Sequence, residues 1–409
     1  MSVDESPDLV PQPAAAVSPE HARWRAVAAE VADTLATDAL ARDRANQPPF
    51  AEVDLLRRSG LLGLRIPTAH GGAGQDLTTT FDVLRTIGRV DGSIAHLLGY
   101  HYNFLVGSLS DAEPEVRGRI WAQTLAEQWF WASTGSPQDQ DLVLEPAGHG
   151  WTISGRKHFA TGSRVADRLF GYVLDPDTRH RLVVTLNPSK PELVRRDDWD
   201  MLGQRLSASN GLDFHAYPVD AADLLIDYGP ADGPPQPARS LGVLFSQLLF
   251  SQLCQAIADG ALLKARDYTR TSSRPWFHAA VSSASDDPFI VQTYGLLASR
   301  LSAVAALNAQ ATATLEWAHG RGDALTVLER ARVSEVIATS RVVANEVALE
   351  VANRVYDLTG ARATDSRYGF DLAWRNIRTL TLHDPQAYKA TEVGAYFLSG
   401  TLPTPSPYR

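Results

Sequence analysis

The residue pattern of the chain changes in character twice, at about residues 128 and 237, and these two changes limit the folds that it can adopt. Before the first change, apolar residues recur at helical spacing, as in Trp24, Val31 and Leu35. Between the two changes, short β-type runs such as Leu182–Leu186 alternate with Gly and Pro, as a small antiparallel sheet domain requires. Helical spacing then returns almost to the end. The pattern predicts helices, then a β domain, then a helical bundle.

These changes divide the chain into four segments. Residues 1–18 hold three prolines, several acidic residues and little that can pack, so we expect a disordered leader. Ser18-Pro19 then offers an N-cap followed by proline at the first helical position. We therefore expect an N-terminal helical domain at 19–127, a β domain at 128–237, and a C-terminal bundle domain with a tail at 238–409.

The last segment contains two long apolar helices. Apolar residues from Val333 to Val355 lie along one broad face of a helix that we expect to stop at Gly360, a natural C-terminal cap. A second helix, Leu296–Leu315, is rich in small residues and apolar on more than one side. Such a helix must be buried within a bundle or in a subunit interface, and we expect a homotetramer.

The composition excludes several classes of function. With 409 residues and 44% hydrophobic content, the chain can bury a large core. Its net charge of -9 and isoelectric point near 5.7 argue against a nucleic-acid or anionic-membrane partner, since both need a basic face. Cys254 is the only cysteine, which excludes an intramolecular disulfide, and we expect no metal site.

Membrane spans and export signals are not apparent either. No apolar stretch approaches the roughly 20 residues that a membrane span needs. The N-terminus lacks the basic-then-apolar order of a signal peptide. We expect a cytoplasmic protein whose partner is a small molecule.

Several segments resemble one superfamily of flavin enzymes. Residues 55–67, LLRRSGLLGLRIP, and 71–74, GGAG, look like the N-terminal signature of the acyl-CoA dehydrogenases, and 151–159, WTISGRKHF, resembles their β-domain segment that turns beside the flavin. Within this superfamily the chain is most similar to the dibenzothiophene monooxygenase group, for example in HLLGYH at 96–101 and LHDP at 382–385. The resemblance implies an acyl-CoA dehydrogenase-like fold, with an N-terminal α-helical domain, a central antiparallel β domain and a C-terminal four-helix bundle.

The segment after Arg375-Asn376 separates two activities. Acyl-CoA dehydrogenases usually place a free glutamate here, which abstracts the proton next to the thioester carbonyl while hydride passes to flavin. This chain has the shorter Asp384, followed by Pro385, which restrains its backbone. That geometry suits an Asp N-cap better than a reaching base. Dehydrogenation is disfavoured, although dehydrogenases with a base on another helix keep it open.

The resemblance to the monooxygenases implies a different site. In those enzymes reduced flavin and O2 form a C4a-(hydro)peroxyflavin, which must be shielded from water and held by hydrogen bonds. His96, Tyr100 and His383 match residues that line this pocket, and a neutral histidine ring offers both a donor and an acceptor. Read without the resemblance, His96 is equally well a core histidine and His383 a helix-start residue. Their place in matched motifs favours catalytic roles for all three.

The β domain is expected to supply the other side of the pocket. Ser133 and Thr161 match polar positions that face the flavin in the relatives, and we assign Thr161 a catalytic role as well. The relatives carry an amide near Ser133 and a serine near Thr161, so this chain departs from the pattern in pocket width and polarity. Trp199 is expected to close one wall of the flavin site, although an aromatic residue in a β domain is more often part of the core.

Phosphate binding requires cations, and no glycine-rich dinucleotide fingerprint follows a strand. The resemblance implies that Arg274 and Arg362 hold the flavin phosphate, with Arg274 reaching across from a neighbouring subunit. A guanidinium group binds phosphate oxygens in pairs, which suits arginine to this role. The alternative is that both are ordinary surface arginines.

These observations predict a two-component flavin-dependent monooxygenase. It would receive reduced FMN, with FAD as a possible substitute, from a separate NAD(P)H:flavin reductase, because nothing in the chain resembles a nicotinamide site. It would use O2 to oxygenate a small organic molecule, with sulfur or nitrogen as the favoured atom. Two alternatives remain: an FAD-dependent acyl-CoA dehydrogenase, and a binding homologue that has lost flavin.

Overall fold

The computed structural model of the chain describes residues 18–135, 139, 142–230 and 236–404. Apart from Ser18, the leader predicted at 1–18 lies outside the described residues. The first helix begins where expected, because the Ser18 side chain accepts a hydrogen bond from the His21 backbone N–H at 3.1 Å and Pro19 starts the first turn. The α-helices of the N-terminal part are α1 (Pro19–Ala36), α2 (Ala39–Ala45), α3 (Phe50–Arg58), α4 (Leu77–Gly88), α5 (Gly92–Tyr102) and α6 (Pro114–Glu127).

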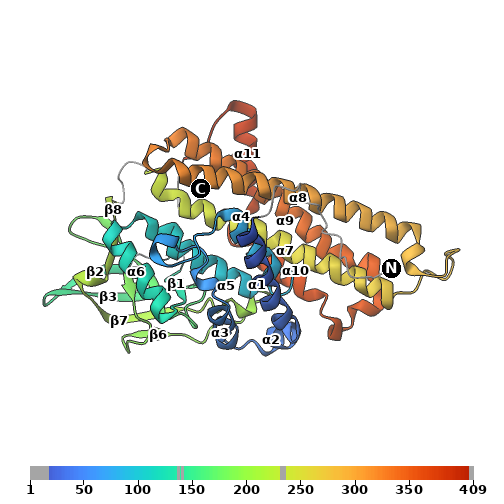
Figure 1. Ribbon diagram of the computed structural model, residues 1–409, viewed down its shortest axis with the longest axis horizontal. Helices are drawn as coiled ribbons and strands as arrows, with labels where there is room; N and C mark the ends of the chain where they lie inside the picture. The colour runs from blue at the N-terminus through green and yellow to red at the C-terminus, as the bar shows by residue number, and fades with distance from the viewer. Residues whose placement is uncertain (1–17, 136–138, 140–141, 231–235, 405–409) are drawn as a thin grey trace.

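A twisted sheet of eight strands occupies one end of the molecule, beside α6 and α5 (Figure 1). Its spatial order is β6-β7-β3-β2-β4-β5-β8, and β1 pairs with β4. The strands are β1 (Trp131–Ser133), β2 (Leu142–Ala147), β3 (Gly150–Lys157), β4 (Arg168–Leu174), β5 (His180–Leu186), β6 (Leu193–Arg195), β7 (Leu212–Val219) and β8 (Leu224–Pro230).

The sheet is mixed, so the expectation of a purely antiparallel domain was wrong in part. Both β1 and β2 pair with β4 in the parallel direction, whereas the other pairings are antiparallel. Trp131–Ser133 lies beside the start of β4 and Leu142–Val143 beside its end. The two short strands therefore act as one interrupted strand along a single edge of β4, an arrangement that hairpin signals in the sequence do not reveal.

Three long helices form the C-terminal bundle, with two shorter helices packed on them (Figure 1). Helix α9 runs along both α7 and α8, and it ends at Gly360 as predicted. Ser251 and Ser340 both donate to the Asn308 Oδ1 at 2.6 Å, which fixes the three long helices in one register. The helices are α7 (Leu241–Thr271), α8 (Pro288–Arg321), α9 (Val327–Thr359), α10 (Asp371–Leu380) and α11 (Gln386–Ser399).

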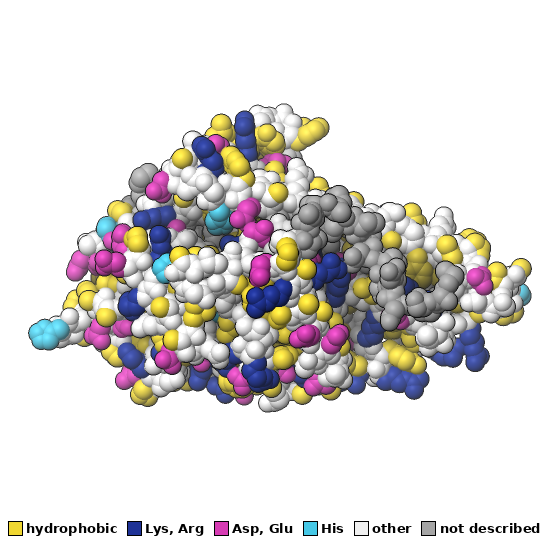
Figure 2. Space-filling view, in the orientation of Figure 1, with side chains coloured by type: hydrophobic (Ala, Val, Ile, Leu, Met, Phe, Trp, Pro, Cys, Tyr) yellow, Lys and Arg dark blue, Asp and Glu magenta, His cyan; other side chains and the backbone are white. Residues whose placement is uncertain are grey.

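Helices α7 and α8 correct the expectation that no stretch is apolar enough to cross a membrane. By length and composition alone, both would serve as spans. The apolar window of α7 is 83% buried, as expected for a core helix, whereas that of α8 is only 22% buried. Phe289, Leu296 and Trp317 of α8 are among the exposed large residues. Figure 2 shows hydrophobic side chains along the part of the bundle that extends away from the sheet, and on the projecting α11.

His101 joins the N-terminal helices to the sheet. Its Nε2 lies 2.9 Å from the Leu62 carbonyl oxygen, and the Trp131 backbone N–H donates to its Nδ1 at 3.1 Å. One ring nitrogen therefore donates and the other accepts, which only a neutral imidazole can do. Burial lowers the pKa of His101 to about 4, in agreement with this arrangement.

We expect His101 to make stability depend on pH. Its pKa in the folded protein is below the unfolded value of 6.5, so its contribution is present above pH 6.5 and is lost as the pH falls toward 4. The slope should reach about 1.4 kcal/mol per pH unit. In His101→Asn the free energy of unfolding should be lower at pH 7 but should decline less steeply between pH 6.5 and 4.5, as urea titrations would show. Equal slopes in the two proteins would contradict the assignment.

Candidate active site

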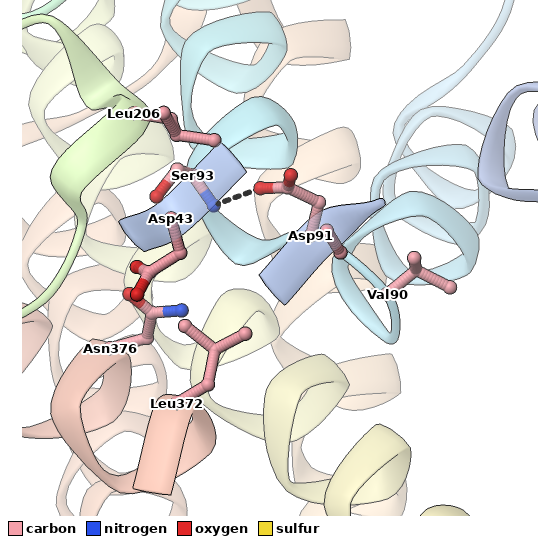
Figure 3. A pocket seen from close by; sticks show the side chains of 8 residues that line it. Asp43, Val90, Asp91, Ser93, Leu206, Leu372 and Asn376 are labelled. Carbon is pink, nitrogen blue, oxygen red and sulfur yellow. Dashed lines mark hydrogen bonds between the residues drawn. The ribbon is translucent and has the colours of Figure 1, made fainter. Parts of the chain in front are cut away.

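Helix α5 carries His96 and Tyr100, and Asp91 fixes where this helix begins. The Asp91 carboxylate accepts hydrogen bonds from the backbone N–H groups of Ser93 and Ile94, both at 3.1 Å (Figure 3). Burial raises the pKa of Asp91 although Arg42, 3.1 Å away, opposes the rise. A cavity of about 10 Å³ beside it has room for one water molecule at most. The start of α5 is thus closely packed.

Two glycines let α5 approach α7 closely. A Cβ atom at Gly92 would lie 2.5 Å from Ile257, and one at Gly99 would lie 2.5 Å from Leu249. Both distances are shorter than ordinary Cβ contacts, so a side chain at either position would have to displace the end of the Ile257 or Leu249 side chain. Because His96 and Tyr100 lie one turn apart, the close approach places both of them against the same part of α7.

Phe250 of α7 stands at the centre of the resulting aromatic cluster. Its ring centroid lies 5.4 Å from that of His96, 6.3 Å from that of Tyr100 and 4.3 Å from that of His383. His96 and Tyr100 also contact each other, with centroids 4.9 Å apart. The structure therefore brings together three of the predicted catalytic residues, from α5 and from the turn before α11, around one ring.

His96 is buried and neutral. Burial lowers its pKa to about 3, although a hydrogen bond with Gln204 opposes the shift. Its Nδ1 lies 3.1 Å from the Gln204 Oε1, while its Nε2 is buried with no hydrogen-bond partner among the described residues. A buried polar atom without a partner is costly in a core, so this nitrogen points to a ligand that completes the site.

Asp384 binds Arg341 and does not cap a helix, which corrects the N-cap interpretation. Its Oδ1 accepts from the Arg341 guanidinium and lies 3.3 Å from the His383 Nδ1. Helix α11 has no side-chain cap. Burial opposes ionisation, but His383 and Arg341 outweigh it and lower the pKa of Asp384. Through Oδ1 the ionised carboxylate orients His383, and its lowered pKa makes it a weak base, while its Oδ2 has no hydrogen-bond partner among the described residues.

Arg341 is itself held from several sides. Its guanidinium group also donates to the Gln247 Oε1 and lies over the ring of Phe250, 5.0 Å from the centroid. Arg341 is 1% exposed. Arg341 of α9 therefore contacts both α7 and the turn that carries His383, next to the Phe250 ring.

The β domain places the hydroxyl groups of Thr161 and Ser209 near α5. The Thr161 Oγ1 lies 2.9 Å from the Ser209 Oγ, so this hydroxyl already has one partner in the protein. A Cβ atom at Gly162 would lie 3.2 Å from Ala132 and 3.3 Å from Leu97 of α5. The segment with Thr161 is thus inserted between α5 and strand β1, which ends at Ser133.

Trp199 and Phe159 form an aromatic wall beside these hydroxyls. Their ring centroids are 6.2 Å apart, nearly perpendicular, and the Trp199 indole N–H donates to the Gln204 carbonyl at 2.9 Å. Phe159 has φ 54° and is 59% exposed. An exposed aromatic ring held in a strained backbone conformation is a feature of binding sites.

Arg274 and Arg362 lie far from the His96 cluster of their own chain. Arg274 follows the end of α7, and about 30 Å of helix separates Phe250 from Thr271. The Ser273 Oγ donates to the Thr359 carbonyl at 3.3 Å, which ties this end of α7 to the end of α9, just before Arg362. Both arginines are exposed at the same end of the bundle. Neither can reach the aromatic cluster within one chain.

The profile of the acyl-CoA dehydrogenase N-terminal domain matches residues 18–126, and that of the C-terminal domain matches 249–386. A probable FMNH2-dependent monooxygenase, SfnC, of Pseudomonas putida is 37% identical over 385 residues, covering 94% of this chain and 96% of that protein. A dibenzothiophene monooxygenase of Mycolicibacterium goodii is 37% identical over 399 residues, covering 93% and 94%.

The chain belongs to the flavin-dependent monooxygenases of the acyl-CoA dehydrogenase superfamily. The crystal structure of methanesulfinate monooxygenase MsuC from Pseudomonas fluorescens superposes with a TM-score of 0.90 at 34% identity, covering 94% of this chain and 99% of that one. The fold predicted from the sequence is therefore confirmed, apart from the parallel strand pairs.

The sequence did not indicate three residues that contact the predicted site or the turn that carries His383: Phe250, Arg341 and Gln204. The first two lie within apolar helical patterns, where a phenylalanine and an arginine carry no signal of their own. Gln204 contacts His96 across 108 positions of the sequence. A pairing at that separation is visible only in the folded chain.

The Arg341–Asp384 pair yields a stability prediction. Arg341→Met leaves a buried carboxylate without its cation and should lower the free energy of unfolding by about 3–5 kcal/mol. Arg354→Met is the control on the same helix, since Arg354 pairs with Glu350 and Asp357 near the surface and should cost less than about 1 kcal/mol. Urea titration measures both. Equal losses of unfolding free energy in the two variants would show that the buried pair stabilises the fold no more than a surface pair does.

Proposed function

We propose that the chain is the oxygenase of a two-component system. It would take reduced FMN from a separate NAD(P)H:flavin reductase in the cytoplasm and use O2, through a C4a-(hydro)peroxyflavin, to oxygenate a small organic molecule. The observation that carries this proposal is the pair of histidines at Phe250, one of which has a buried Nε2 without a hydrogen-bond partner in the described part of the chain. The relative from Pseudomonas putida, named as FMNH2-dependent, supports FMN over FAD.

The residues fit a flavin. Ser133 ends β1, and the Thr161 segment lies between β1 and α5, so we propose that both hydroxyl groups hydrogen-bond the polar edge of an isoalloxazine ring. Trp199 would cover one face of the ring. Reduced FMN would supply the electrons that activate O2.

The side chains of the helical half would protect the reaction. His96 stays neutral at physiological pH and offers Nε2 as an acceptor, and Asp384 holds His383 in a fixed orientation. Phe250 lies against both histidine rings and against Tyr100, and it would limit the access of water to the buried His96. Hydrogen bonds made to a buried group are stronger than those made in water.

A sulfur compound is the favoured substrate. The names of two relatives specify dibenzothiophene and methanesulfinate, and both of these molecules carry the sulfur atom that such enzymes oxidise. The exposed Phe159 and the neighbouring Trp199 offer an apolar, polarisable surface for a thioether or thiophene. Nitrogen is the second choice.

Dehydrogenation is the weaker alternative. The carboxylate that stands where a dehydrogenase base is expected is paired with Arg341 and holds His383. A homologue without flavin is weaker still, since it would leave the buried Nε2 of His96 without a function.

We also propose a homotetramer in which subunits share their flavin sites. The uncovered face of α8 calls for a partner, and the exposed Trp276 and Phe277 lie beside Arg274 at the end of the bundle. Since Arg274 and Arg362 emerge together, both would bind the flavin phosphate of a neighbouring subunit, and not Arg274 alone.

The function can be tested directly. The protein would be incubated with a flavin reductase, NADH, FMN, air and a panel of thioethers, thiophenes, sulfinates, amines and indoles. We expect a product heavier by one oxygen atom, and no turnover when the reductase is left out. Full activity with NADH alone would refute the two-component proposal.

His96→Ala and His383→Ala should fold normally yet release hydrogen peroxide in place of product. Removing one hydrogen-bonding group from a preorganised site should lower product formed per FMN oxidised by roughly tenfold or more. The control is His149→Ala in the exposed β2–β3 turn, which should keep wild-type coupling. Wild-type coupling in His383→Ala would show that this histidine has no part in oxygen transfer.

Sharing of sites predicts complementation. Arg274→Ala and His383→Ala chains should each be nearly inactive when expressed alone. When they are co-expressed and mix at random, about half of the sites have an intact His383, and about half of those receive an intact Arg274 from the neighbouring subunit. About a quarter of wild-type activity should therefore return. The control is a mixture of Arg274→Ala and Arg362→Ala chains, which should recover no activity. Each site takes both arginines from one neighbouring subunit, and every subunit in this mixture lacks one of them. No recovery in the first mixture would place Arg274 outside a shared site.

A further inference from the structure

Gln204 is a buried residue with a defined contact to the candidate site. Its side chain is 1% exposed, and its Oε1 lies 3.1 Å from the Nδ1 of His96. In this orientation of the amide, the carbonyl oxygen faces His96 and can only accept, so the hydrogen bond requires a proton on Nδ1, while the Gln204 Nε2 has no partner among the described residues. In a neutral ring the His96 Nε2 is then unprotonated and can only accept. This atom, too, has no partner in the described part of the chain.

The backbone of Gln204 is held in an unfavourable conformation. Its φ of 54° lies in the left-handed region, where residues other than glycine are uncommon. The Gln204 N–H donates to the Asn376 Oδ1 at 2.6 Å, and its carbonyl accepts from the Trp199 indole at 2.9 Å. Strain of this kind persists only where the surroundings enforce it, and it often marks functional sites.

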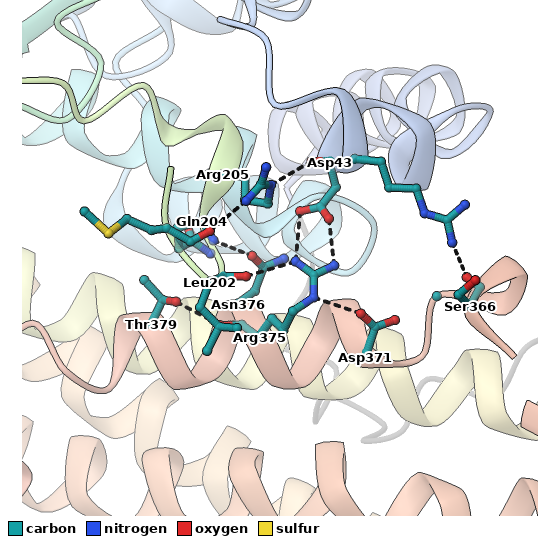
Figure 4. Close-up of polar contacts among 12 residues, drawn as sticks. Asp43, Leu202, Gln204, Arg205, Ser366, Asp371, Arg375, Asn376 and Thr379 are labelled. Carbon is teal, nitrogen blue, oxygen red and sulfur yellow. Dashed lines mark hydrogen bonds and ion pairs between the residues drawn. The ribbon is translucent and has the colours of Figure 1, made fainter. Parts of the chain in front are cut away.

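A network of charges fixes the loop that carries Gln204 (Figure 4). Arg375 of α10 binds the Asp43 carboxylate at 2.7 Å and donates to the Leu202 carbonyl at 3.0 Å. Arg205 donates to the Asp43 carbonyl at 2.9 Å. The loop is therefore clamped between α2 and α10 on both sides of Gln204, and its amide is held against His96.

We propose that Gln204 is a positioning residue that keeps His96 in the Nδ1–H tautomer, so that the unprotonated Nε2 faces the reacting groups. This inference rests on the oxygenase function proposed above. The opposite tautomer would present a donor at the same point. Gln204 thus decides whether His96 receives or gives a hydrogen bond there.

The consequence is chemical as well as geometric. An unprotonated Nε2 can accept a hydrogen bond from an N–H or O–H group at the site and hold that proton in place. Burial keeps the ring neutral, since the pKa of His96 is lowered to about 3. A ring without a fixed partner would exchange between tautomers and would accept only part of the time.

The tautomer can be measured without turnover. In ¹⁵N NMR of the full-length protein labelled with ¹⁵N-histidine, protonated and unprotonated ring nitrogens have well-separated shifts, and His96→Asn identifies the His96 signals by their loss. We expect the wild-type protein to show a protonated Nδ1 and a bare Nε2, and Gln204→Met to show a mixture. A protonated Nε2 in the wild type, or an unchanged spectrum in Gln204→Met, would overturn the proposal.

Turnover gives an independent test. Gln204→Met should raise the ratio of hydrogen peroxide to product about tenfold, the effect of losing one hydrogen bond. In a His96→Ala background the same change should add nothing, because Gln204 acts through His96. Gln252→Met, at an equally buried glutamine of α7 that bonds Thr312, is the control for lost stability and should keep wild-type coupling.

The outcomes separate the two proposals. Multiplicative effects in the double variant would show a general structural role for Gln204 and would overturn its assignment. If no variant, including the wild type, forms an oxygenated product, the oxygenase proposal fails, while the NMR result still decides the tautomer.

Discussion

Helix α5 lies so close to α7 that a Cβ atom at Gly92 or Gly99 would overlap the side-chain end of Ile257 or Leu249. The rest of the candidate site depends on this contact. It presses His96 and Tyr100 against Phe250, and Phe250 in turn contacts His383 from the C-terminal turn. A larger residue at either glycine would displace the end of the Ile257 or Leu249 side chain. Close packing of α5 on α7 thus buries His96 beside Phe250.

Buried polar groups then set the character of that space. The ion pair between Arg341 and Asp384 is costly to bury, and such pairs are weak evidence of stability. Here the pair holds His383 and keeps the Asp384 carboxylate beside a cation, which orients one histidine and makes the carboxylate a weaker base. The amide of Gln204 serves the other histidine. The two histidines at Phe250 therefore have different partners, Gln204 for His96 and Asp384 for His383.

The sequence predicted the order of helices and strands well, because helical spacing and Gly- and Pro-rich turns are local signals. His96 and Tyr100, one turn apart, could be placed on one helix face for the same reason. The parallel strands beside β4 could not be predicted, since their pairing joins segments that hairpin rules do not connect. Asp384 was misread as a cap because its partner, Arg341, is 43 positions away and on another helix.

Neither the sequence nor a single folded chain explains the positions of Arg274 and Arg362. Their distance from Phe250 within one chain becomes meaningful only when a second subunit is considered, and the uncovered face of α8 gives the reason to consider it.

We propose that this chain transfers one oxygen atom from O2 to substrate with electrons from free reduced FMN. A single turnover tests this: the protein, chemically reduced FMN and a sulfur substrate are mixed without air and then exposed to ¹⁸O2, with neither reductase nor nicotinamide present. We expect a product that carries one ¹⁸O atom. Reoxidation of the flavin that yields only hydrogen peroxide with every substrate, or a product oxygen that comes from water, would contradict it.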